Sequence, residues 1–188
     1  MKSLLLIFVL FLAKAGQLPG QSLPDYRSKA LTRALKKADI GDPDTLKEIR
    51  VDKMNSKIHS NGKFFKIDNP DNKTGYLYIG RVFTCRAGGC SIANTNKTGK
   101  EVTSTEYFDY FIIYNKLKEL VMVKIYNYQA THGYEISSRG WLKQFSGYNG
   151  SNEMRVNKNI DAISGATISV HSITGDIIKT TSILNSVN

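Results

Sequence analysis

The residues of this chain with the clearest potential for chemistry are those at positions 161–167, DAISGAT. Gly165 and Ala166 are small and leave room for a bulky group to approach the backbone. Thr167 begins a predicted helix, where free N–H groups and the helix macrodipole favour an anion such as phosphate. Asp161 lies six residues upstream, where its carboxylate could hold a metal ion or an incoming reagent. On the residues alone, an ordinary N-cap at Thr167 is the favoured interpretation and a phosphate site is the alternative.

The same seven residues resemble the D-x-x-[ST]-G-A-T flavinylation motif of the FMN-binding domain family. That family includes the flavin subunits of the Rnf complex and of the sodium-pumping NADH:quinone reductase. In it, an exported Mg²⁺-dependent flavin transferase uses FAD to esterify FMN through its phosphate to the last threonine of the motif. The resemblance implies that Thr167 carries covalent FMN as a phosphoester. It also implies that Asp161, Ser164, Gly165 and Ala166 are the recognition residues of this cofactor site.

Two further segments extend the resemblance. Residues 86–92, RAGGCSI, resemble the Gly-Gly-containing segment that precedes the central hairpin of the family. Residues 126–147 are similar to the family stretch that runs from H-x-E-T-P-G-x-G to a Trp-Leu-x-x-Phe cluster. In total the resemblance covers about residues 64–187, which implies that the FMN-binding domain makes up most of the chain.

One feature of the family is replaced in this chain. Residues 130–133 are Ala-Thr-His-Gly where the family has Glu-Thr-Pro-Gly. By position, the resemblance implies that Thr131, His132 and Gly133 shape the flavin pocket, with contacts that differ from those of the family. His132 could hydrogen-bond the flavin, or it could be a loop histidine that bonds the backbone. Tyr134 lies beside this loop and could stack on the flavin, whereas the strand tyrosines are expected to be core residues or cross-strand pairs.

The two cysteines, Cys85 and Cys90, have the spacing C-x4-C and three interpretations. A structural disulfide is favoured, because disulfides persist in exported proteins and this one would hold the loop after a predicted strand. A redox-active pair that exchanges electrons with the flavin is the second interpretation. A metal site is the weakest, because zinc sites usually need four ligands at typical spacings.

The first fifteen residues have the pattern of a secretory signal peptide. Lys2 provides the positive charge, residues 4–12 form a short apolar run, and Ala13-Lys14-Ala15 fits an A-x-A cleavage site. The apolar run is too short for a stable membrane anchor, which needs about 20 residues. We therefore expect an exported protein, cleaved near Ala15 and located in the periplasm, the cell envelope or the medium.

The formal charge of the 188-residue chain is +10, but its Lys and Arg residues are scattered. No basic-aromatic motif stands out, so we expect a solvated basic surface and no nucleic-acid partner. Such a surface could dock an acidic redox partner through a small, transient interface. The apolar content of 41% is enough for one folded core.

The pattern of apolar residues predicts a single α+β domain with an antiparallel sheet and flanking helices. The parallel βαβ rhythm of Rossmann folds is absent from the pattern. We predict a signal peptide at 1–15, a lead and helix at 16–58, and the FMN-binding domain at 59–188. The expected elements are a helix at 26–40 capped by Asp25, a helical turn at 45–48, strands at 64–67, 76–83, 108–114 and 120–128, and helices at 141–145 and 167–184.

The resemblance implies an exported electron carrier rather than a stand-alone enzyme, because the flavin does the redox chemistry. The implied partners are a flavin transferase and redox proteins that the sequence does not name, with a membrane-associated electron-transfer complex among the candidates. One alternative is a non-redox exported binding or structural module. The other is a flavin-linked thiol-disulfide reductase that uses Cys85 and Cys90.

Overall fold

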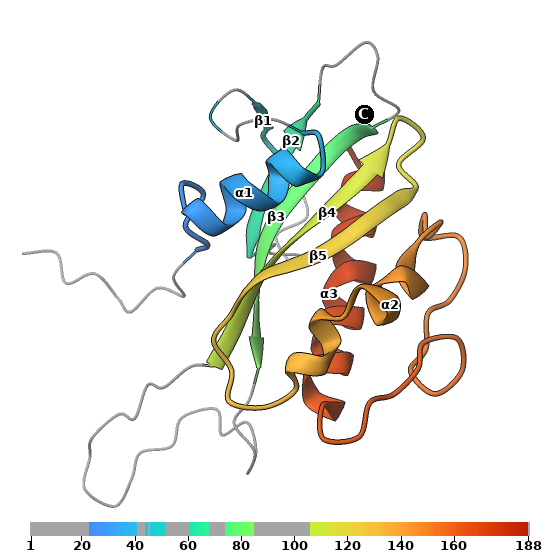
Figure 1. Ribbon diagram of the computed structural model, residues 1–188. Helices are drawn as coiled ribbons and strands as arrows, with labels where there is room; N and C mark the ends of the chain where they lie inside the picture. Colours follow the sequence, from blue (N-terminus) through green and yellow to red (C-terminus); the bar gives the residue numbers. More distant parts are fainter. Residues whose placement is uncertain are drawn as a thin grey trace, which may run out of the picture.

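A five-stranded antiparallel sheet in the order β1-β2-β3-β4-β5 forms the centre of the computed structural model (Figure 1). The structure describes residues 23–40, 44, 46–51, 61–67, 74–84 and 106–187. The strands are β1 Lys47–Ile49, β2 Gly62–Lys66, β3 Thr74–Thr84, β4 Glu106–Asn115 and β5 Leu120–Tyr128. Each strand pairs antiparallel with the next along the chain. This meander, with its helices, confirms the predicted α+β domain.

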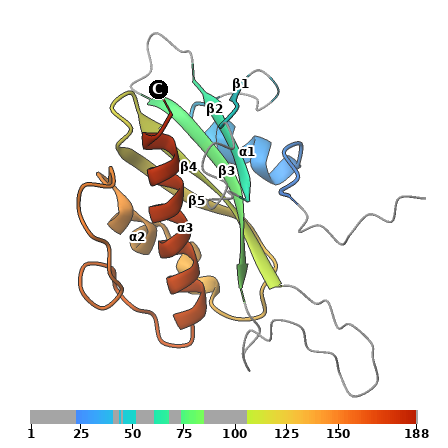
Figure 2. The same ribbon diagram turned by 180° about the vertical axis from the view of Figure 1, so that it is seen from behind.

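Helices cover both faces of the sheet. In Figure 1 α1 lies in front of the strands and α3 behind them, and the reversed view in Figure 2 shows α3 in front. Short helices follow β5 and lead toward the last part of the chain. The helical segments are α1 Lys29–Lys37, the 3-10 helix η2 Tyr134–Ser137, α2 Arg139–Leu142, the 3-10 helix η3 Lys143–Phe145 and α3 Thr167–Asn185.

The sheet carries a separate hydrophobic cluster on each face, because successive side chains of a strand point to opposite sides. On one face Leu77, Phe111 and Ile113 pack with Leu31 and Leu35 of α1. On the other face, three tyrosines and their neighbours pack against α3 and the short helices. That larger cluster includes Tyr78, Phe108, Tyr110, Ile112, Tyr114, Trp141, Phe145, Val170, Ile173 and Ile177.

Two sequence predictions at the N-terminal side are wrong. Ser28, not Asp25, caps α1, because the Ser28 hydroxyl accepts a hydrogen bond from the N–H of Leu31 at 3.1 Å. Asp25 instead accepts from the N–H of Arg27 in the preceding turn. Residues 47–49 form strand β1 rather than a helical turn, since they pair with residues 64–66 of β2. Pairing with a neighbouring strand has overridden the local sequence preference there.

The strands predicted at 108–114 and 120–128 are confirmed, and as β4 and β5 they form an antiparallel hairpin. Its turn is built on Asn115, whose side-chain oxygen accepts hydrogen bonds from the N–H groups of Leu117 and Glu119 at 2.9 Å each. Lys118 adopts a left-handed backbone with φ of 63°. Asn side chains that bond the backbone two residues on are typical of tight turns, so this residue sets the register of the two long strands.

Elements on both sides of residue 58 contribute to one sheet. Strand β1 precedes that position and pairs with β2, and α1 packs on the face that contains Phe65 and Leu77. Within the described ranges, no helix combines the length and the apolar character needed to cross a membrane.

A carboxylate of α3 lies against the tyrosine-rich face of the sheet. The hydroxyl of Tyr110 donates a hydrogen bond to Asp176 at 2.6 Å. Burial raises the pKa of the Asp176 carboxyl above its ordinary value of 3.8, although the Tyr110 hydrogen bond and Lys179 act in the opposite direction. The folded chain therefore binds this proton more tightly than the unfolded chain.

We expect Asp176→Asn to raise the melting temperature at pH 7. The free energy of unfolding that Asp176 contributes falls as the pH rises from its ordinary pKa of 3.8 through the raised folded pKa. Asparagine keeps an oxygen that can accept from Tyr110, and it carries no charge. The difference in melting temperature between Asp176→Asn and the unaltered chain should therefore shrink as the pH falls toward 3.8. Thermal melts from pH 3 to 8, with the exposed Glu135→Gln as control, measure this. A lower melting temperature for Asp176→Asn at pH 7 would contradict the assignment.

Candidate functional site

Thr167 is the first residue of α3, and its side chain is exposed. The N-cap is Ala166, which has no side-chain oxygen, so Thr167 does not cap its own helix. The first hydrogen bond of the helix runs from the N–H of Val170 to the carbonyl of Ala166 at 2.9 Å. No described side chain bonds the backbone N–H groups that precede Val170 in α3. An anion beside Thr167 would therefore meet free donors and the positive end of the helix.

A tight turn delivers the chain to this helix start. The N–H of Ala166 donates to the carbonyl of Ile163 at 3.1 Å, with Ser164 and Gly165 between them and exposed. Gly165 has φ of +80°, a left-handed conformation that favours glycine. A Cβ at Gly165 would meet no heavy atom within 4 Å, so the space beside the turn is open. The predicted room for a bulky group therefore exists next to Thr167.

The start of the motif is fixed through its backbone. The indole N–H of Trp141 donates to the carbonyl of Asp161 at 2.9 Å. The N–H of Asp161 donates to the side-chain oxygen of Gln144 at 2.8 Å. Trp141 is itself buried, with its ring 5.3 Å from that of Phe145. The α2–η3 segment therefore holds Asp161 in place while its carboxylate stays exposed to solvent.

The loop after β5 packs against the first turn of α3. The hydroxyl of Tyr128 donates to the carbonyl of His132 at 2.6 Å and lies 3.2 Å from the hydroxyl of Ser169. Gly133 has φ of +85°, and a Cβ there would lie 2.7 Å from the Ser169 hydroxyl. The structure thus places His132 and Gly133 beside the helix that begins with Thr167.

The remaining loop residues form the rim of this region. Thr131 donates its hydroxyl to Glu106 at 2.6 Å, which ties the loop to the start of β4. Tyr134 is 68% exposed, and its ring meets that of Tyr128 edge to face at 5.5 Å. Ile168, next to Thr167, is 41% exposed. Two exposed apolar side chains therefore flank the loop and the helix start, and each offers a surface for a flat ring.

The predicted site residues do not all contact one another. Among the described residues, Asp161 and Ser164 make no hydrogen bond to residues 131–133. No cluster of three or more His, Cys, Asp or Glu side chains that could hold a metal ion occurs in the described part of the chain. Cys85 and Cys90 lie outside the described residues, so the disulfide stays a prediction.

Sequence reasoning did not identify three residues around the motif. Gln144 and Ser169 act through contacts between distant segments, for which the sequence holds no local signal. His171 is exposed and follows Thr167 by four residues in α3, a spacing that places both on one face of a helix. The i, i+4 pattern of a hydroxyl and an imidazole could have pointed to His171.

Gly133 and Gly165 allow a matched comparison. Both adopt left-handed backbones, so alanine at either position costs about 1–2 kcal/mol of stability through its Cβ. We expect Gly133→Ala to cost more than Gly165→Ala, because only at Gly133 does the new Cβ collide with Ser169 and Tyr128. Urea unfolding of the two variants measures the difference. Equal costs would mean that the loop does not pack on α3 as described.

Residues 108–179 match the family model described as the FMN-binding domain. The matched region runs from β4 into α3, so it contains both the loop at 131–133 and the motif at 161–167. No curated protein matches the chain.

Proposed function

Since residues 108–179 match the FMN-binding domain family, we propose that this chain is an electron carrier with FMN esterified to Thr167. The observation that carries the proposal is the exposed Thr167 hydroxyl at the uncapped start of α3, inside the matched domain. Bound FMN supplies reversible electron transfer, and the protein supplies attachment, orientation and electrostatics.

The residues around Thr167 fit a phosphate ester and a large ring system. The free N–H groups at the start of α3 suit the phosphate charge. The open space beside Gly165 accommodates the approach of the group to the backbone. Tyr134 and Ile168 offer apolar surface to the isoalloxazine, and the backbone of His132 and Gly133 is fixed beside them.

Attachment requires one substitution at phosphorus. In the proposed attachment, the Thr167 oxygen would form a bond to the FMN phosphorus of FAD while the pyrophosphate bond would break. AMP would leave and the hydroxyl proton would pass to the surroundings, so the protein would gain FMN less one water. Thr167 does not have to give up a structural hydrogen bond for this step, because its hydroxyl has no partner among the described residues. A separate flavin transferase supplies the catalysis in this proposal.

The exposure of the region favours electron transfer between proteins over the turnover of a small substrate. Among the described residues, Thr167, His132 and Tyr134 all lie at the surface rather than in an enclosed pocket. A flavin held there would be accessible to partner proteins, and short-lived docking suits such exchange.

We propose export for the same protein, on the signal-peptide pattern of residues 1–15. A covalent bond would then retain the cofactor outside the cytoplasm, where lost FMN is not easily replaced. The proposed partners are the exported flavin transferase and redox proteins of the envelope. Cell fractionation tests the location, and a chain that keeps residues 1–15 and remains in the cytoplasm would contradict it.

The function is tested by redox titration of the chain co-produced with an exported flavin transferase. We expect a yellow protein whose colour is lost on chemical reduction and fully restored on oxidation, through repeated cycles. The colour should also remain with the protein after denaturation. A colourless chain, with the transferase shown to be active on a control substrate, would overturn the proposal and favour the non-redox module.

A further inference from the structure

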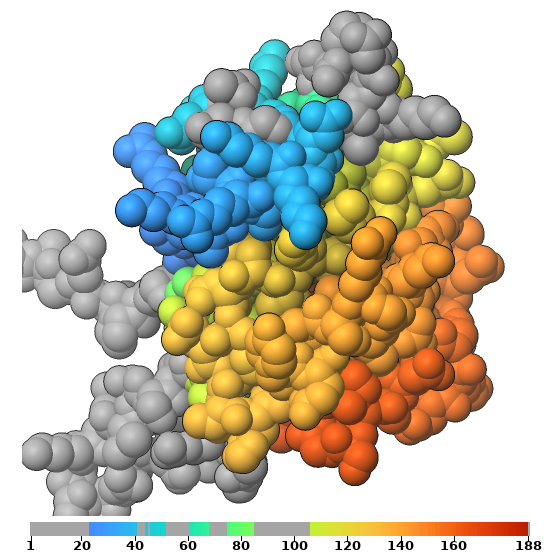
Figure 3. Space-filling view, viewed as in Figure 1, coloured from blue at the N-terminus to red at the C-terminus, as the bar shows by residue number. Residues whose placement is uncertain are grey.

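A groove of about 530 Å³ lies away from the flavin region, between α1 and the α2–η3 segment. Its floor is β5, and in the space-filling view α1 and the segments after β5 stand on the same face of the molecule (Figure 3). None of the predicted flavin-site residues lines it. The groove is therefore a second candidate site, distinct from the one around Thr167.

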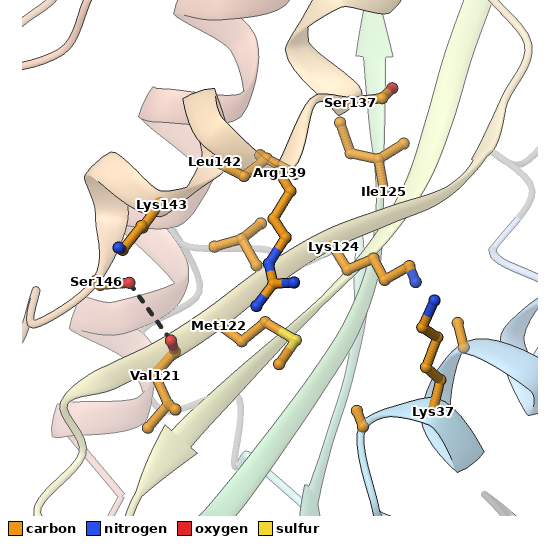
Figure 4. A pocket seen from close by; sticks show the side chains of 13 residues that line it. Lys37, Val121, Met122, Lys124, Ile125, Ser137, Arg139, Leu142, Lys143 and Ser146 are labelled. Atoms are coloured by element: carbon orange, nitrogen blue, oxygen red, sulfur yellow. Dashed lines mark hydrogen bonds between the residues drawn. The ribbon is translucent and has the colours of Figure 1, made fainter.

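The charged side chains that line the groove are cationic. Four cationic side chains line it, and no Asp or Glu of the described ranges is among its lining residues. Figure 4 shows Lys37 and Lys124 extending toward each other, and Arg139 extending over Met122. Lys143 is the fourth. Within the described part of the chain none of these four forms an ion pair. Like charges held together without counter-ions favour an anionic occupant.

The floor of the groove also offers an unpaired strand edge. β5 is the last strand of the sheet, and the described residues that bond its outer edge meet only its start. Leu120 pairs outward with Tyr148 and Gly147 at 2.8 Å each, and Ser146 donates to the carbonyl of Val121 at 3.4 Å. From residue 122 to residue 128, no described residue pairs with the outer edge of β5. Free N–H and C=O groups of this kind can accept another strand.

Exposed apolar side chains mark the same edge. Val121 is 45% exposed and Met122 is 37% exposed, and Leu117 protrudes from the adjoining hairpin turn. Protein surfaces that expose apolar groups with a charged rim are typical of interaction sites.

We propose that this groove binds an extended, acidic segment of a partner protein, which adds as a strand to the outer edge of β5. The carboxylates of the segment would meet Lys37, Lys124 and Arg139, and its apolar side chains would meet Met122. Backbone hydrogen bonds supply affinity in this mode of recognition, and the side-chain contacts supply specificity.

Other occupants fit the groove less well. A second copy paired through β5 would bring two sets of the same cations together. Residues 1–22 of this chain contain Lys2 and Lys14 and no acidic residue, so they do not complement the charge. An anionic membrane would meet the exposed rim but would leave the backbone edge unpaired.

The groove is also joined to the flavinylation motif through one short segment. Arg139 and Lys143 of α2–η3 line the groove, while Trp141 and Gln144 of the same segment bond the backbone of Asp161. A partner segment on β5 would therefore dock against the element that holds the start of the motif.

Binding is tested with a fluorescent peptide that alternates Glu with Val and Thr. The double variant Lys124→Glu, Arg139→Glu should weaken it about ten-fold or more, since two attractive contacts become repulsive. The control is Arg33→Glu with Lys158→Glu, which changes the net charge equally at exposed positions outside the groove. Circular dichroism and thermal melts verify that each variant is folded.

Two further measurements test the strand pairing itself. N-methylation of alternate peptide bonds should abolish binding without changing the charge of the peptide, and hydrogen exchange of residues 122–128 should slow in the complex. Equal weakening by both double variants would overturn the proposal, because the attraction would then be non-specific. So would binding of anionic vesicles that the peptide does not displace, or dimerisation through β5.

Discussion

We expect that replacement of Thr167 by alanine abolishes covalent attachment of FMN, whereas replacement by serine retains it. The proposed phosphoester would need a hydroxyl at the first position of α3, and serine provides one at the same place. Alanine should leave the fold intact, because the Thr167 side chain is exposed and is not the cap of the helix. The loss of flavin can therefore be separated from unfolding.

The measurement is flavin fluorescence of the denatured protein after co-production with the transferase. Ser182→Ala is the matched control, because Ser182 is also an exposed hydroxyl residue on α3. It should retain the full signal. Fluorescence in Thr167→Ala equal to that of the unaltered chain would place the attachment elsewhere.

The second large effect concerns a buried ion pair between β3 and β4. Arg81 donates to both carboxylate oxygens of Asp109, at 2.6 and 3.0 Å, and the two residues face each other across the strands. The amide of Asn127 donates to the same carboxylate at 2.8 Å. The guanidinium also lies 3.7 Å from the ring centre of Tyr107. Exposure is 5% for Arg81 and 2% for Asp109, so water cannot replace either partner.

We expect Asp109→Ala to lower the free energy of unfolding by about 3–5 kcal/mol, because it leaves the Arg81 charge buried without its carboxylate. Urea unfolding measures this value. The partly exposed pair of Lys63 and Glu48, joined at 2.7 Å, is the control, and Glu48→Ala should cost less than about 1 kcal/mol. The double variant Arg81→Met, Asp109→Leu should recover much of the loss. A cost below about 1 kcal/mol for Asp109→Ala would contradict the burial of the pair.

The long elements could be predicted because their patterns are strong. Strands β3 to β5 alternate or carry many aromatic and β-branched residues, and a turn at Asn115 separates the last two. The start of α3 was predicted at Thr167, where the helix begins. By contrast, β1 has three residues and two of them are exposed, so it depends on pairing with β2 rather than on a pattern of its own.

In the candidate site, too, some residues could be predicted from the sequence and others could not. The motif at 161–167 and the loop at 131–133 could be selected from the sequence, because a family resemblance pointed to them. The residues that hold this motif and this loop in place could not be selected from the sequence. Gln144 bonds a residue 17 positions away, and Tyr128 contacts Ser169 across 41 positions. The groove beside β5 depends on which strand ends the sheet and on side chains from α1, β5 and the short helices that follow β5. Only the folded arrangement brings these together.

The most direct test of the central claim is peptide mapping of the protein after co-production with an active flavin transferase. Trypsin should release residues 159–179 as one peptide, because Lys158 and Lys179 flank a stretch without Lys or Arg. We predict that this peptide carries the mass of FMN less one water, that fragmentation places it on Thr167, and that phosphorus NMR shows a phosphodiester. An unmodified 159–179 peptide, or FMN recovered on a different peptide, would contradict the account.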